Sequence, residues 1–193
     1  MKQLFTIFLT MVFCFCLSAE DKQNAKKNYI KSNAQALKSY TWYDGNTEKT
    51  AWMLTDVVAE FGNSSLVKSF DKSASVSASY GAVQIWKLGD LTQKESIARS
   101  NSGSFSPVYT NNSNGDGTKM ALTGKIVVFL KPGVDGAKWA SDNNLKIVQK
   151  MNFGNGIVVL STATESIALA NSLRSNPNVE SSQPDWWIET SPR

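Results

Sequence analysis

The residue types that carry most enzymatic chemistry are scarce in this chain. None of its 193 residues is a histidine, and its two cysteines, Cys14 and Cys16, lie within an apolar N-terminal run. Ser-His-Asp and Cys-His catalysis need an imidazole base, and most zinc sites need histidine or cysteine ligands. The Asn/Asp/Gly-rich segment Thr110–Lys119 lacks the later bidentate acid of an EF-hand loop, so we interpret it as a linker or a long hairpin turn. We therefore predict no catalysis, no metal and no cofactor.

The N-terminal residues predict export. The uncharged apolar run Leu4–Leu17 leads to Ala19, which is the pattern of a secretory signal peptide over 1–19, cleaved after Ala19. The run is short for a membrane span. A lipoprotein signal needs a small residue before its cysteine and is the less favoured alternative, because Cys14 and Cys16 each follow Phe. We expect a mature chain that is periplasmic or secreted, with no membrane contact once the signal is removed.

Charge gives no sign of a nucleic-acid partner. Lys and Arg total 20 against 16 acids, for a formal net charge of +4, and this mild excess is spread along the chain. Residues 20–39 are polar and rich in Lys, Asn and Gln. They carry too little apolar surface to offset the entropy of ordering, so we predict a polar tether there.

Residues 40–105 predict a small mostly-β domain, because aromatic and alternating segments lie between glycines at turn positions. Trp42, Trp52 and Trp86 are interpreted as its core, and a ligand-binding aromatic cluster is the alternative. The predicted strands are Trp52–Phe61, Leu66–Phe70, Ser75–Tyr80 and Ala82–Leu88, followed by a helical turn or two within Leu91–Arg99.

Residues 124–187 predict a second domain, joined to the first by a linker or loop over 106–123. The apolar runs Ile126–Leu130 and Ile157–Leu160 are bounded by Gly or Pro, which is typical of strands buried on both faces. Helical spacing follows each run, and two flanking strands complete the order βαββαβ. The predicted fold class is therefore α+β, with a ferredoxin-like C-terminal domain after the small mostly-β domain. The helices are expected over 137–144 and 167–174, and the flanking strands over Lys146–Met151 and Asn178–Gln183.

Three stretches of the second domain resemble a known family. The pieces IVVFLKPGV, GNGIVVLST and ALANSLRSNPNVESSQPD, within Ser106–Trp187, are similar in order and spacing to the propeptides of subtilisin-like serine proteases. The resemblance is closest to the free-standing external chaperones, and to the N-terminal propeptides, of bacterial kexin-like subtilases. Domains of that family fold and then inhibit their protease. The resemblance therefore implies a non-catalytic chaperone and inhibitor whose partner is a subtilisin-like serine protease.

The two central strands also predict a second apolar face. In a ferredoxin-like plan two helices cover one face of a four-stranded sheet and leave the other face open. Because the central strands are apolar on both sides, the side chains of the open face pack either on the N-terminal domain or on a partner, and the resemblance favours a partner. The candidate partner-binding residues of this face are Val127, Phe129, Val158 and Leu160.

The C-terminal tail, residues 188–193, with the two tryptophans before it, is the other candidate site. In the resembled family the tail lies in the substrate cleft as a cleaved product would, so Arg193 is expected near the primary specificity pocket of a protease that prefers basic residues. A surface terminus that binds nothing is the alternative for Thr190–Arg193. The candidate residues here are Trp186, Trp187, Ile188, Glu189, Thr190, Ser191, Pro192 and Arg193.

The sequence thus predicts an exported, non-catalytic chaperone and inhibitor of a subtilisin-like protease, acting through the open sheet face and the tail. Two alternatives remain open. One is a propeptide fragment of a protease whose reading frame is broken, and the other is a secreted structural or glycan-binding β protein that uses its tryptophans.

Overall fold

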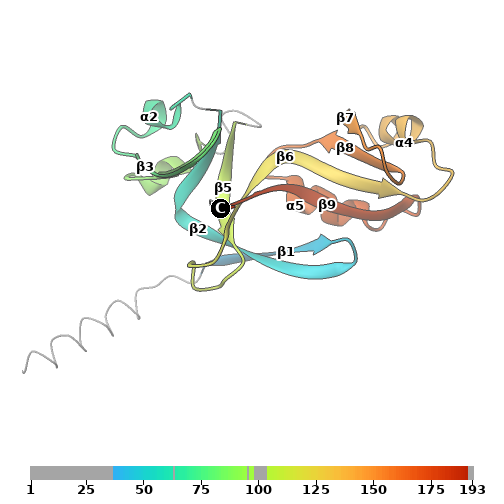
Figure 1. The fold of residues 1–193 in the computed structure, drawn as a ribbon, viewed down its shortest axis with the longest axis horizontal. Coiled ribbons are helices and arrows are strands. Elements are labelled where there is room, and N and C mark those ends of the chain that lie inside the picture. The colour runs from blue at the N-terminus through green and yellow to red at the C-terminus, as the bar shows by residue number, and fades with distance from the viewer. Residues whose placement is uncertain (1–36, 63, 95, 98–103, 191–193) are drawn as a thin grey trace, which may run out of the picture. The chain divides into compact units, whose positions relative to one another are not determined.

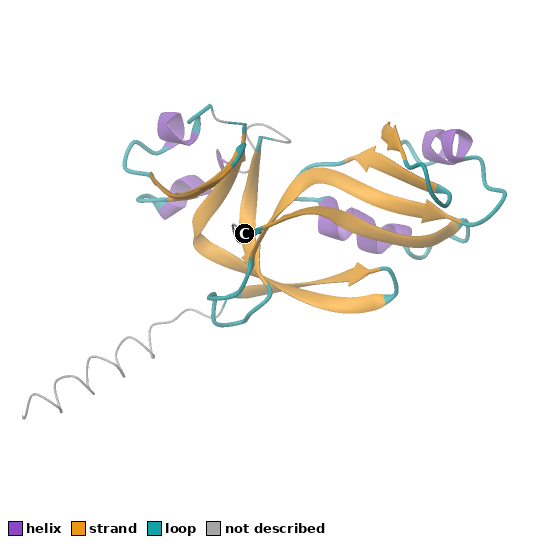
Figure 2. Ribbon diagram, viewed as in Figure 1, coloured by secondary structure: helices purple, strands orange, loops and turns teal. Residues whose placement is uncertain are grey.

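The protein is described by a computed structural model over residues 37–62, 64–94, 96–97 and 104–190. The predicted signal peptide and most of the predicted tether lie outside the described residues. The described chain is mostly β, with antiparallel strands in an open sheet and few helices (Figure 1, Figure 2). This content agrees with a β-rich α+β class.

The first half of the sheet is organised around one long strand, β2 (Thr47–Phe61). Its first residues pair with β1, and its last residues pair with β4 on one side and β5 on the other. Apolar residues alternate along this last part, so Val58 faces one buried cluster and Ala59 faces another. The other elements of this half are β1 (Lys38–Asp44), α2 (Val67–Phe70), β3 (Ser75–Tyr80), β4 (Val83–Lys87), the short 3₁₀ helix η1 (Leu91–Gln93) and β5 (Phe105–Thr110).

One predicted strand in this half is wrong. The apolar residues within Leu66–Phe70 predict a strand, but Val67–Phe70 form the helix α2. Ser65 has a φ of 54°, in the left-handed region, and the carboxylate of Glu60 accepts a hydrogen bond from the backbone N–H of Leu66 at 2.8 Å. Together they turn the chain out of the sheet after β2. The determining contact comes from a side chain six residues earlier, which a local apolar pattern does not reveal.

The second half of the sheet has the strand order β9-β6-β8-β7, and every neighbouring pair is antiparallel. Along the chain the elements alternate so that a helix follows β6 and another follows β8. They are β6 (Lys119–Leu130), α4 (Gly136–Asp142), β7 (Ile147–Lys150), β8 (Gly156–Leu160), α5 (Ser166–Leu173) and β9 (Val179–Ile188).

The helices α4 and α5 cover one face of these four strands. Ile126, Val128 and Leu130 of β6 are at most 1% exposed and pack with Trp139 of α4 and Leu173 of α5. Because successive strand residues point to opposite faces, this set of alternate residues fixes the core side of the sheet. Helix α5 lies behind β6 and β9 in the view of Figure 1. We call this side the helix face and the opposite side the outer face.

The strands of the two predicted domains are hydrogen-bonded into one sheet. Strand β5 pairs with the beginning of β6, with Val108 opposite Ala121. Residues predicted as a linker over 106–123 thus belong largely to two strands, and the Asn/Gly-rich segment between them is a hairpin turn. All six residues of β5 are buried, which a loop would not allow without leaving backbone groups unpaired.

The β1–β2 hairpin reaches from the first half of the sheet to α5 and β9. Its turn residue Gly45 donates from its N–H to the Gln183 side chain at 3.0 Å, and its carbonyl accepts from the Arg174 guanidinium at 2.7 Å. That guanidinium also lies 3.9 Å from the centre of the Tyr43 ring. Asn171 of α5 donates to the Thr41 carbonyl at 2.8 Å. The hairpin therefore fastens the first half of the sheet to α5 and to the edge strand β9 of the second half.

The two faces can be tested with one substitution made on each. Leu130→Ala removes a side chain that is 1% exposed on the helix face, and we expect it to lower the free energy of unfolding by about 2–5 kcal/mol. Leu160→Ala removes the same atoms from a side chain that is 48% exposed on the outer face, and we expect a loss within about 0.5 kcal/mol. Urea unfolding followed by tryptophan fluorescence measures both. Equal losses would contradict the assignment of the faces.

Candidate protein-binding surface

The outer face carries all four sheet residues that the sequence singled out. Val127 of β6 pairs with Val158 of β8, and Lys125 pairs with Leu160, so both β8 residues lie on the same side as Val127 and Phe129. Leu160 is 48% exposed, Val127 and Phe129 are partly buried, and Val158 is 8% exposed. The hydrogen bonds of the β1–β2 hairpin described above are made with Gln183, Asn171 and Arg174, and not with these four residues. The sequence therefore grouped these residues correctly on one face.

A fifth apolar residue, Phe153, joins this face from the turn between β7 and β8. Its ring centre lies 6.2 Å from that of Phe129, with 36° between the ring planes, and it is 64% exposed. Sequence reasoning missed Phe153 because it lies outside every predicted strand. The neighbouring glycines of the FGNG stretch were the available signal. We define the outer patch as Val127, Phe129, Phe153, Val158 and Leu160.

Glycines make room for the aromatic pair. A Cβ on Gly156 would lie 2.8 Å from Sδ of Met151, closer than real Cβ atoms approach, and a tight 3.0 Å from Cε1 of Phe129. Gly154 has a φ of +59° and faces the same phenyl ring. The Phe129 ring can therefore rest on bare backbone, which leaves the Phe153 ring standing out beside it.

The first three residues of the candidate tail site, Trp186 to Ile188, lie inside the sheet. Trp186 and Trp187 are residues of β9 and pair with Leu122 and Ala121 of β6, and Ile188 pairs with Met120. The tryptophan rings contact aromatic residues of the first half of the sheet in edge-on or tilted geometry. Ring-centre distances are 5.5 Å for Trp186–Trp42, 5.3 Å for Trp186–Tyr109 and 5.4 Å for Trp187–Tyr80.

Glu189 anchors the end of β9. Its carboxylate accepts a hydrogen bond from the backbone N–H of Lys119 at 3.1 Å, accepts another from the Tyr80 hydroxyl, and lies 3.5 Å from the Lys119 ammonium. Burial raises the pKa of Glu189, but these hydrogen bonds and the nearby charge outweigh it and hold the pKa below its ordinary value. The same hydrogen bond raises the pKa of Tyr80. Of the remaining tail residues, Thr190 is exposed, and Ser191, Pro192 and Arg193 lie outside the described residues.

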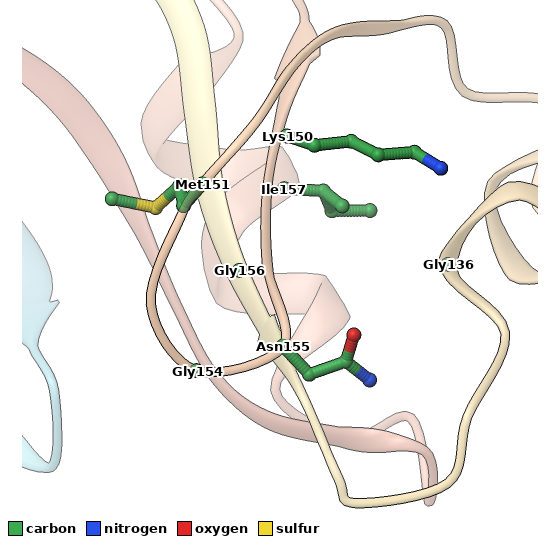
Figure 3. Close-up of a pocket in the computed structure, with 7 residues that line it drawn as sticks. All are labelled: Gly136, Lys150, Met151, Gly154, Asn155, Gly156 and Ile157. Carbon is green, nitrogen blue, oxygen red and sulfur yellow. The ribbon is translucent and has the colours of Figure 1, made fainter.

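A small cavity of about 100 Å³ lies on the helix-face side of the same turn. Figure 3 shows Lys150, Asn155 and Ile157 directed toward Gly136, and Met151 directed the opposite way. The Asn155 amide already donates to the carbonyls of Lys131 and Val134, at 3.2 and 2.9 Å. The Asn155 side chain thus lines the cavity while it holds the loop before α4 in place. We assign no chemistry to this cavity.

Neither a metal cluster nor a membrane-crossing helix occurs in the part of the chain that the structure describes. No group of three or more Asp, Glu, His or Cys residues is placed there to hold a metal ion, and no helix there is long and apolar enough to cross a membrane. The arrangement of the described residues can bind another molecule through the outer patch. It offers no reactive group at that patch.

Residues 93–187 match the model of a family described as "Open reading frame 2 N-terminal domain". No curated protein and no solved structure matches the chain. The resemblance to subtilisin-like protease propeptides is corrected by this result, because the family that matches this part of the chain is not a subtilisin propeptide family. The description of the matched family names no activity, so any function has to be argued from the surface.

The role of Glu189 predicts a specific pH dependence. Its folded pKa is depressed, so its contribution to stability is present above the ordinary value of 4.5 and is lost as the pH falls through the folded pKa. We expect Glu189→Gln to lower the free energy of unfolding by about 1 kcal/mol at pH 7, and the difference from wild type to shrink below pH 4. Urea unfolding at pH 7, 5 and 3 measures it. Glu180→Gln, at an exposed position of β9, is the control, and a difference that did not depend on pH would contradict the role.

Proposed function

We propose that this chain is an exported, non-catalytic chaperone and inhibitor that binds a subtilisin-like, kexin-like serine protease through the outer patch. The observation that carries the proposal is the patch itself, an apolar sheet face with Phe153 64% and Leu160 48% exposed. It belongs to a chain that contains no histidine to act as a catalytic base. The protease class is the one expected from the sequence pattern, and the refolding experiment below tests it.

Physical reasons favour binding as the use of this face. Burying an apolar side chain stabilises a fold, yet Phe153 and Leu160 of this patch stay 64% and 48% exposed. Exposed aromatic residues gathered on one face are typical of protein-interaction sites, in which a few large side chains carry most of the binding energy. Polar residues of β9, Ser181 and Gln183, border the patch on one side, as expected for the rim of an interface.

The finer architecture belongs to the same proposal. We propose that residues 124–187 are a ferredoxin-like domain. The strand order β9-β6-β8-β7, the antiparallel pairing and the position of α4 and α5 on one face support this arrangement. Such a plan leaves one sheet face free for a partner, which is the face that bears the outer patch.

Binding to the native protease would account for both the chaperone activity and the inhibition. A binder present at a thousandfold excess over its Kd stabilises the folded partner by about 4 kcal/mol. It speeds folding only if its contacts already exist in the folding transition state. Only the residues after Glu189 are proposed to enter the substrate cleft as a tail, because β6 and Tyr80 hold Trp186 to Glu189 in the sheet.

Refolding of a denatured kexin-like protease tests the proposal. We expect wild-type chain to raise the recovered activity and, in excess, to inhibit the native enzyme. Leu160→Ser should weaken inhibition by about tenfold, because it removes an apolar contact from the interface. Leu91→Ser is the matched control, since Leu91 is similarly exposed, at 54%, but lies in the first half of the sheet. Equal recovery with and without the protein, and no inhibition, would refute the proposal.

A further inference from the structure

We propose that the outer patch is polarised, with an aromatic end and a lysine end, and that it fits a protein surface that offers an apolar pocket beside carboxylates at a matching distance. This inference rests on the proposed function and deepens it, because it states the chemistry of the partner's surface. It follows from the positions of residues along β6, β7 and β8.

The aromatic end lies where β8 begins. Phe129 is the register partner of Gly156, the first residue of β8, and Phe153 stands beside it. Phe153 is the most exposed of the large apolar side chains among the described residues. Its ring already lies 6.2 Å from that of Phe129, centre to centre, so it gives up part of its freedom before it enters a partner's pocket. This end supplies the apolar anchor.

The lysine end lies where β8 finishes. Lys125 is the register partner of Leu160, and the Leu160 N–H donates to the carbonyl of Lys146 at 2.8 Å. Ile126 and Ile147 pack against the helix-face core, so the residue before each of them is directed to the outer face by strand alternation. Both lysines are exposed, and neither forms an ion pair within the described chain. Leu160 is thus flanked by two cations that have no acidic partner among the described residues.

The distance between the two ends follows from the strand. From Gly156 to Leu160 the chain advances four residues, or about 13 Å at the usual rise of a β-strand. A partner that fills both ends needs an apolar pocket and one or two carboxylates at about that separation. The apolar end should govern how long the complex lasts, and the lysine end how fast it forms, because exposed charges act mainly on association.

Salt-dependent association with the protease tests the lysine end. The double variant Lys125→Glu/Lys146→Glu should slow association at low salt by about tenfold or more and lose most of the effect in 0.5 M salt. The control Lys49→Glu/Lys72→Glu makes the same change of net charge at exposed positions of the first half of the sheet and should leave the rate within about twofold. Equal rates for the two double variants would overturn the inference while leaving the proposed function intact.

If the protease does not bind, the proposed function fails, but the polarity of the outer patch can still be tested with two dyes. Anilinonaphthalene sulfonate combines apolar rings with a negative charge, and Nile red is apolar and uncharged. Phe153→Ser should weaken both dyes by about fivefold, whereas Lys125→Glu/Lys146→Glu should weaken only the anionic dye. Equal binding of the anionic dye by the two double lysine variants overturns the inference.

A vesicle-binding experiment distinguishes a protein partner from a lipid surface as the ligand of the lysine end. Wild-type chain is mixed with phosphatidylserine vesicles and with phosphatidylcholine vesicles in sedimentation assays. We expect no enrichment on either. Binding to the anionic vesicles that is lost in Lys125→Glu/Lys146→Glu, but not in the control pair, would assign the lysine end to a membrane and overturn the inference of a protein partner.

Discussion

Strand β6 carries the constraint on which the rest of the structure depends. It pairs with β5 through its first residues and with β8 through its last, while β9 runs beside it for most of its length. Because side chains alternate along a strand, the choice of Ile126, Val128 and Leu130 for the helix face leaves Val127 and Phe129 for the other side. A shift by one residue would exchange the core and the outer patch. One strand of twelve residues therefore contributes both to the helix-face core and to the outer patch.

Local patterns predicted the parts of the fold that local residues determine. The apolar runs Ile126–Leu130 and Ile157–Leu160 form strands in the structure, and α4 and α5 overlap most of the predicted helical stretches, each beginning one residue earlier. Period-two and helical spacing encode these elements directly. The grouping of Val127, Phe129, Val158 and Leu160 on one face follows from the same alternation, because the register places Val127 opposite Val158 and Lys125 opposite Leu160.

Contacts between distant residues account for what the sequence did not reveal. Phe153 becomes part of the outer patch only because Gly154 and Gly156 bring its turn against Phe129. The tryptophans of β9 read as a tail, yet Trp186 packs on Trp42 and closes a cluster built from both halves of the chain. A sequence pattern does not show which distant residues pack together. In the structure, the strands on either side of the predicted domain boundary belong to one continuous sheet.

The hydrogen bond between Tyr80 and Glu189 has a consequence for how the chain folds. The two residues are 109 positions apart, and β9 pairs with β6 across most of its length. A sheet closed by such distant segments has a high contact order and folds slowly, because its long loops must close before their contacts form. Until β9 pairs, one edge of β6 lacks its hydrogen-bond partners, because β8 covers only the other edge. The unpaired edge can bond to any extended segment that meets it, so the order in which the strands form decides whether the sheet closes on itself or on another chain.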